Sequence, residues 1–164
     1  MNSIQDHYIA WLRDAHAMEK QAETMLTTIM KRVGSYPELQ KMLEQHRGET
    51  REQERLIREC IERHGSTASI AKDMTAQISG MAQGLSSLFA SDEVVKTILA
   101  LYTFKHMEIA SYKILISAAS ERGDAETRRV CESILLQEER MATWIEEHLA
   151  SLTQQFLQHE KTTD

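Results

Sequence analysis

The 164-residue sequence is poor in the residues that make turns and disulfides, with one proline, six glycines and two cysteines. So little proline and glycine argues against a turn-rich β architecture, and the nine methionines instead favour helices. Cys60 and Cys131 are too few and too far apart for a disulfide framework. We interpret both as reduced core thiols of a protein in the cytoplasm.

The sequence also lacks a basic region and a long apolar run. Its net charge of −6 argues against a nucleic-acid-binding protein, which would present a basic stripe. No apolar run approaches the roughly 20 residues that span a bilayer. The first residues show no basic leader followed by an apolar stretch, so no secretory signal is visible. We therefore expect a cytoplasmic protein with neither a nucleic-acid nor a membrane partner.

Capping and helix-breaking residues predict four long helices. Ser3 with Asp6 caps the first, and Ser35 with Glu38 forms a capping box before the second. Asp124 caps the fourth. The predicted helices cover roughly residues 4–33, 37–64, 92–122 and 125–155.

The connections between these helices predict the topology. Two short hairpins make the first and second helices, and the third and fourth, antiparallel neighbours. Residues 66–90 are small and weakly polar, which indicates a long crossover between helices two and three that carries a short extra helix. We expect an all-α, ferritin-like four-helix bundle, with residues 1–155 as a single domain and residues 156–164 as a frayed tail.

Each predicted helix carries an apolar seam with alternating spacings of three and four residues. Every seam is interrupted near its middle by polar residues, at positions where a bundle normally buries leucine. The seams are Tyr8, Leu12, Ala15, Glu19, Ala22, Leu26 and Ile29; Leu39, Met42, His46, Glu49, Gln53, Leu56 and Cys60; Ile98, Leu101, Lys105, Glu108, Tyr112, Leu115 and Ala119; and Cys131, Ile134, Glu138, Met141, Ile145 and His148.

One glutamate from each helix is thus predicted to face the bundle interior: Glu19, Glu49, Glu108 and Glu138. Two carboxylates 4 Å apart repel by about 4 kcal/mol at an effective dielectric constant near 20, a large cost beside a total stability of roughly 5–15 kcal/mol. The cluster therefore takes up protons, pairs with internal cations or binds metal. Oxygen and imidazole ligands in this number suit iron or manganese. The pattern alone leaves a metal centre and a hydrogen-bonded polar network equally open.

Four stretches resemble the YciE/YciF-like stress proteins of the ferritin-like superfamily. They are LRDAHAMEKQ (12–21), QHRGETREQERL (45–56), KHMEIASYKIL (105–115) and LLQEERMATWIEEHL (135–149). The resemblance implies a ferritin-like core, a dimer, a di-metal centre and an association with stress responses. It places the metal ligands at Glu19, Glu49, Glu108, and Glu138 or Glu139. His46, Gln53 and Tyr112 match the family pattern as well.

Lys105 stands where relatives commonly carry glutamate. An ammonium inside the cluster neutralises one carboxylate and repels a metal ion. Four carboxylates and Lys105 leave a charge of −3, which suits one divalent ion better than two. We therefore expect a degenerate site, either mononuclear or metal-free with a Lys105–glutamate pair. The alternative is that Lys105 extends its long side chain to the bundle surface.

These observations leave two main hypotheses for function. The first is a ferritin-like protein that binds iron or manganese, with His46 as a further ligand or a hydrogen-bond partner of a carboxylate. Gln53, Lys105 and Tyr112 would surround the site, and redox activity toward oxygen or peroxide is left open. The second is a non-catalytic structural or protein-interaction homodimer that retains the buried polar layer.

Overall fold

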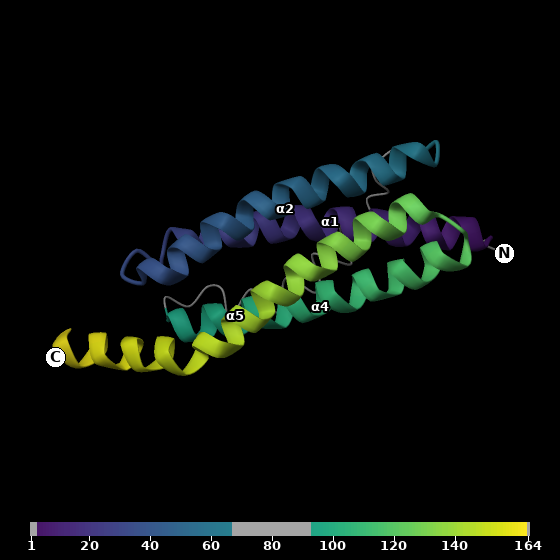
Figure 1. Cartoon of the computed structure of the whole chain (residues 1–164). Coiled ribbons are helices and arrows are strands. Elements are labelled where there is room, and N and C mark those ends of the chain that lie inside the picture. Colours follow the sequence, from purple (N-terminus) through teal and green to yellow (C-terminus); the bar gives the residue numbers. More distant parts are fainter. Residues whose placement is uncertain (1–2, 67–92, 164) are drawn as a thin grey trace.

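The described part of the chain forms a bundle of four long helices (Figure 1). The computed structural model describes residues 3–66 and 93–163, and no strand occurs in these two ranges. The short extra helix predicted within the crossover lies outside the described residues. The helices are α1 (Ile4–Met30), α2 (Pro37–Arg63), α4 (Val94–Glu121) and α5 (Ala125–Thr163).

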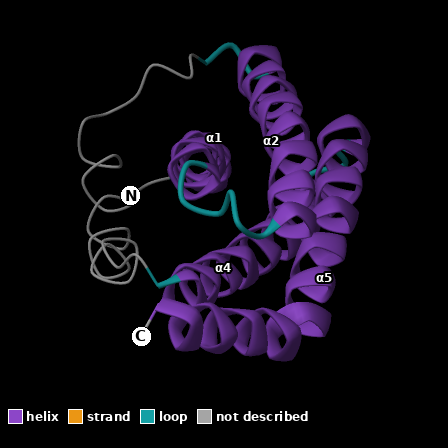
Figure 2. Ribbon diagram, turned by 90° about the vertical axis from the view of Figure 1, so that its left-hand side faces the viewer, coloured by secondary structure: helices purple, strands orange, loops and turns teal. Residues whose placement is uncertain are grey.

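Two antiparallel hairpins, α1–α2 and α4–α5, pack against each other (Figures 1 and 2). Helix α1 contacts α2 and α4, and α5 contacts α4 and α2, so the order around the bundle is α1–α2–α5–α4. The end of α2 and the beginning of α4 lie at opposite ends of the bundle (Figure 1). This arrangement requires a long crossover and confirms the predicted ferritin-like layout.

Most of the predicted helix boundaries agree with the structure. The capping box of Ser3 with Asp6 is present, and Asp124 accepts a hydrogen bond from the Thr127 amide at 3.0 Å. Gly65 and Gly123 follow α2 and α4 with φ of 68° and 67°, a backbone conformation that favours glycine.

Two expectations about helix ends were wrong. No side chain caps α2, because its first turn begins directly at Pro37 behind Tyr36 rather than behind Ser35. Helix α5 does not end near Gln155 but continues to Thr163. Residues 125–163 contain neither glycine nor proline, and Phe156 still packs against the core, so nothing interrupts the helix.

The apolar core consists of two clusters that lie on either side of the polar layer. The first contains Leu12, Ile57, Leu115 and Ile134 among others. The second lies nearer the other end of the bundle and contains Leu26, Leu43, Leu101 and Ile145. The buried charged residues therefore sit between two dry regions, where water does not screen them. None of the helices in the described ranges combines the length and apolar character that a membrane span requires.

The predicted seams of α1 and α4 are fully buried, but that of α2 is displaced at every second position. Leu39, His46, Gln53 and Cys60 are buried as expected. Between them the buried residues are Leu43, Thr50 and Ile57 rather than Met42, Glu49 and Leu56. The α2 seam therefore contributes the hydroxyl of Thr50 to the interior instead of a fourth carboxylate.

Candidate functional site: a buried carboxylate cluster

Three glutamates from three helices meet in the middle of the bundle. Glu19 comes from α1, Glu108 from α4 and Glu138 from α5, and all three are fully buried. One carboxylate oxygen from each lies within 4.8 Å of the others. The alternating seam spacing produces this convergence, because it turns the same face of each helix inward at one level.

Lys105 lies inside this cluster and does not reach the surface. Its Nζ atom is 2.5 Å from Glu108 Oε2 and 2.8 Å from Glu138 Oε2. The third contact is a hydrogen bond of 2.8 Å to Nε2 of His46. An ammonium has three N–H groups, so these three acceptors account for all of them. The alternative in which Lys105 extends to the bundle surface is therefore wrong.

His46 connects the cluster to the edge of the bundle. Its Nε2 accepts from Lys105, so Nδ1 carries the proton and donates to Glu49 Oε2 over 3.1 Å. His46 is buried, but the Glu49 side chain is 21% exposed and lies outside the carboxylate cluster. The expectation that four glutamates meet at one buried level is thus corrected to three.

Glu138, not Glu139, faces the cluster. The Glu139 side chain is 42% exposed, and its carboxylate lies 3.5 Å from Lys113 on the surface. Tyr112 is buried and donates its hydroxyl proton to Glu19. Gln53 is also buried, but its side-chain amide donates a hydrogen bond to Gln137 at 2.7 Å and not to any of the three carboxylates.

Burial and the contacts with Lys105 separate the pKa values of the three glutamates. Burial and the nearby charge of Glu138 raise the pKa of Glu19 to about 8. The same two causes raise the pKa of Glu108 well above its ordinary value. Burial alone would raise the pKa of Glu138, but the Lys105 ammonium holds it below its usual range. Without a metal, Lys105 thus favours the ionised form of Glu138, whereas burial favours the protonated forms of Glu19 and Glu108.

Several carboxylate oxygens of the cluster accept no hydrogen bond from the described residues. They are Glu19 Oε2, Glu108 Oε1 and Glu138 Oε1, one from each carboxylate. Such unpartnered buried oxygens are what a hard divalent cation would use as ligands. Three carboxylates and Lys105 carry a formal charge of −2, so one divalent cation makes the cluster neutral whereas two leave a charge of +2. The residues therefore fit one cation and do not fit a pair.

The sequence patterns did not identify a second buried histidine next to this site. His16 is only 2% exposed, and its Nε2 bonds to Glu54 of α2. The position of His16, three residues before Glu19, is the one signal in the sequence that places it near the cluster. His16 lies on the α1–α2 side of the bundle, whereas Glu49 lies on the α2–α5 side.

Comparisons with known proteins agree with this architecture. Residues 3–158 match a family described as a domain of unknown function, DUF892. A crystal structure of a protein from Xanthomonas campestris pv. campestris shares 37% identity, with a TM-score of 0.82, and the match covers 98% of this chain and 99% of that one.

More distant structures share the fold. The Escherichia coli stress protein YciF is 21% identical, with a TM-score of 0.82, and the match covers 94% of this chain and 99% of that one. Symerythrin from Cyanophora paradoxa, at 14% identity and a TM-score of 0.64, matches over 93% of this chain and 87% of that one. With a family match over nearly its whole length and a ferritin-like bundle around a buried carboxylate cluster, this chain belongs to the DUF892 family.

Proposed function

We propose that this protein binds a single divalent cation, iron or manganese, between Glu19, Glu108 and Glu138. The observation that carries the proposal is the group of buried carboxylate oxygens with no hydrogen-bond donor in the described part of the chain. An unpartnered buried polar atom costs about 1–3 kcal/mol, and more when it is charged. A cation with oxygen ligands removes this cost for all three residues together.

The charge of the cluster sets the number of cations. In a protein that holds two metal ions, four carboxylates balance a charge of +4. Here Glu49 lies outside the cluster and Lys105 supplies one positive charge from the protein itself. Lys105 therefore takes the place of one metal ion, and the remaining charge of −2 is matched by the other.

The surrounding residues have distinct roles in this proposal. Tyr112 orients Glu19 through its hydroxyl, and Lys105, which is itself bonded to His46, holds Glu138 in place from the opposite side. Because the three ligands are carboxylates, the site favours hard cations over zinc or copper. Iron or manganese held there would supply a redox or Lewis-acid centre. An association with stress responses is part of the same proposal, and the E. coli neighbour described as a stress protein supports it.

A second candidate is a structural homodimer that keeps the polar layer without metal. The full set of contacts made by Lys105 favours it, because the ammonium already compensates one carboxylate and protons on Glu19 and Glu108 compensate the others. In this case the polar layer fixes the register of the four helices, as buried polar groups do in some bundles. Light scattering on the metal-free chain measures whether it is a dimer.

Elemental analysis distinguishes the two candidates. We expect the wild-type chain to retain one equivalent of iron or manganese after incubation and desalting, and Glu108→Gln to lose it. Glu139→Gln serves as the matched control, since it makes the same change on the exposed neighbour of Glu138. Two retained equivalents would contradict the mononuclear site. No retained metal in a folded wild-type chain would leave the structural homodimer as the function.

A further inference from the structure

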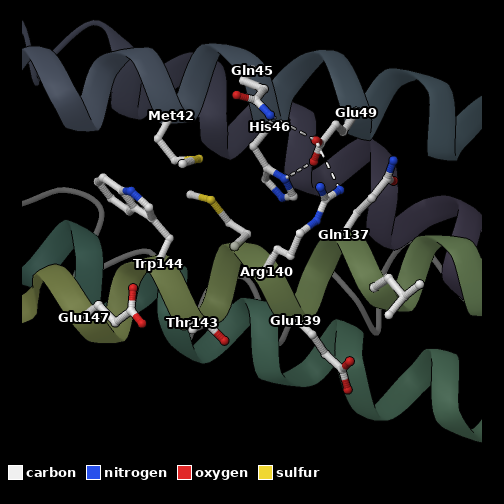
Figure 3. A pocket seen from close by; sticks show the side chains of 12 residues that line it. Met42, Gln45, His46, Glu49, Gln137, Glu139, Arg140, Thr143, Trp144 and Glu147 are labelled. Atoms are coloured by element: carbon white, nitrogen blue, oxygen red, sulfur yellow. Dashed lines mark hydrogen bonds and ion pairs between the residues drawn. The ribbon is translucent and has the colours of Figure 1, made fainter.

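A cleft on one side of the bundle leads toward the buried cluster. It lies between α2 and α5 and has a volume of about 460 Å³ (Figure 3). Met42, Met141 and Trp144 form apolar parts of its wall. Its polar wall includes Glu49 and Arg140, whose side chains face each other across the cleft at 3.7 Å.

His46 is the described residue that belongs both to this cleft and to the cluster. It lines the cleft, and its Nε2 lies 2.8 Å from Lys105 and 3.6 Å from Glu138. One imidazole ring therefore separates the cleft from the three buried carboxylates. On the α1–α2 side, His16 and Glu54 are bonded to each other in the bundle wall.

The charges around the cleft favour cations. Its wall includes Glu49, Glu139, Glu147 and the guanidinium of Arg140. Because the Glu139 carboxylate is paired with Lys113, the formal excess is one negative charge. A cleft lined by charge of one sign raises the local concentration of ions of the other sign and their rate of association. Glu49 lies deepest of the three, since it is hydrogen-bonded to His46 itself.

We propose that the α2–α5 cleft is the path by which a divalent cation reaches the buried carboxylates. Glu49 receives the cation in the cleft, and the His46 ring then moves aside to let it pass to Glu138. This inference rests on the proposed function, because it needs a cation site in the cluster. It assigns a role in entry to Glu49, which lies outside the cluster and forms no part of the buried site.

The first test measures the rate of Mn²⁺ uptake by stopped-flow mixing with a metal-indicator dye. Glu49→Gln removes one negative charge from the cleft, so we expect uptake about tenfold slower at low ionic strength. Arg140→Glu adds negative charge at an exposed position, and we expect uptake several-fold faster. Both effects shrink in 0.5 M salt because screening shortens the range of the attraction.

Glu44→Gln is the matched control for these charge changes. Glu44 lies on the same helix as Glu49, but it is exposed and does not line the cleft. All four proteins should retain one Mn²⁺ per chain at equilibrium, because none of these residues is a proposed ligand. If Glu44→Gln slows uptake as much as Glu49→Gln does, the cleft has no special role and the inference fails.

A second test replaces the ring between the cleft and the cluster. His46→Ala opens the wall, so we expect both Mn²⁺ uptake and its loss to a chelator to become at least fivefold faster. His16→Ala removes an equally buried ring on the α1–α2 side and should leave both rates unchanged. The opposite result, with His16→Ala accelerating exchange, would place the path between α1 and α2.

A third test blocks the cleft without altering its deeper residues. Gln45 is exposed at the edge of the cleft, and both native cysteines are buried. A bulky maleimide on Gln45→Cys should slow uptake about tenfold, whereas the same label on Thr153→Cys of α5 should not. An unchanged rate overturns the path but leaves the metal site standing. A wild-type chain that takes up no Mn²⁺ overturns the proposed function and this inference together.

Discussion

Two polar regions of this bundle differ in how many hydrogen-bond donors they offer to their carboxylates. At the end where α2 meets the α4–α5 turn, Asp124 accepts hydrogen bonds from Tyr8 at 2.9 Å, His64 at 2.8 Å and the Thr127 amide at 3.0 Å. In the middle of the bundle, three carboxylates share one ammonium and one tyrosine hydroxyl.

The difference lies in the ratio of donors to acceptors. Asp124 has three donors for one carboxylate, so its ionised form is favoured despite partial burial: hydrogen bonds from Thr127, Tyr8 and His64 lower its pKa to about 2. The central cluster has too few donors, so burial raises the pKa of Glu19 to about 8. A polar group with enough donors is stabilising by itself, whereas one with too few needs protons or a cation from outside.

The largest expected effect comes from removing the only cation of the cluster in the described structure. In the presence of a chelator, Lys105→Met leaves Glu138 buried with no opposite charge and should destabilise the protein by about 3–5 kcal/mol. Urea unfolding monitored by circular dichroism measures this loss. Lys113→Met, whose side chain is 60% exposed, is the control and should cost less than about 1 kcal/mol. Equal losses in both variants would mean that the buried ion pair contributes nothing special.

Glu19→Gln should act in the opposite direction and stabilise the metal-free chain. Because the pKa of Glu19 is raised to about 8 from an ordinary value of 4.5, its cost is absent below pH 4.5 and grows as the pH rises to 8. We expect the variant to match the wild type near pH 4.5 and to exceed it by about 4 kcal/mol at pH 8. Urea unfolding at several pH values checks this, and a less stable variant at pH 8 would refute it.

Asp124→Asn should give a smaller loss with the reverse pH dependence. Since its pKa is lowered from 3.8 to about 2, the ionised carboxylate contributes stability above pH 3.8, and this contribution disappears as the pH falls through 2. The variant should therefore lose about 1–2 kcal/mol at pH 7 and little at pH 2. Thermal unfolding across this range provides the measurement. A constant difference at all pH values would show that the charge of Asp124 is unimportant.

Much of the cluster could be predicted from the spacing of polar residues within apolar seams. Glu19, Lys105 and Glu108 occupy seam positions that are buried as expected. The choice of Glu138 over Glu139 also follows from its seam, since Ile134 and Met141 lie on the same face of α5. A strong apolar seam leaves only one orientation for such a helix.

In helix α2, by contrast, the seam did not predict which residue is buried beside His46. Leu39, His46, Gln53 and Cys60 repeat every seven residues, and all four belong to the seam. One further seam residue lies between each two of them, and it can follow the first of the two by either three or four residues. Both spacings suit a helix, so Glu49 and Thr50 were equally good candidates by periodicity. In the structure Thr50 is buried, with its hydroxyl bonded to the carbonyl of His46 at 2.9 Å. Burying Glu49 instead would add a fourth carboxylate to a cluster that already lacks donors.

The sequence by itself determined the four-helix bundle, because apolar seams and capping residues are local properties of the chain. It also determined that carboxylates would enter the core at one level, since seam positions are fixed by helical periodicity. Only the tertiary structure decided which oxygens lie close enough to interact, and that Lys105 points inward to three acceptors. Those choices depend on rotations of whole helices and on side-chain torsions, which change contacts between helices without changing the pattern along any one of them.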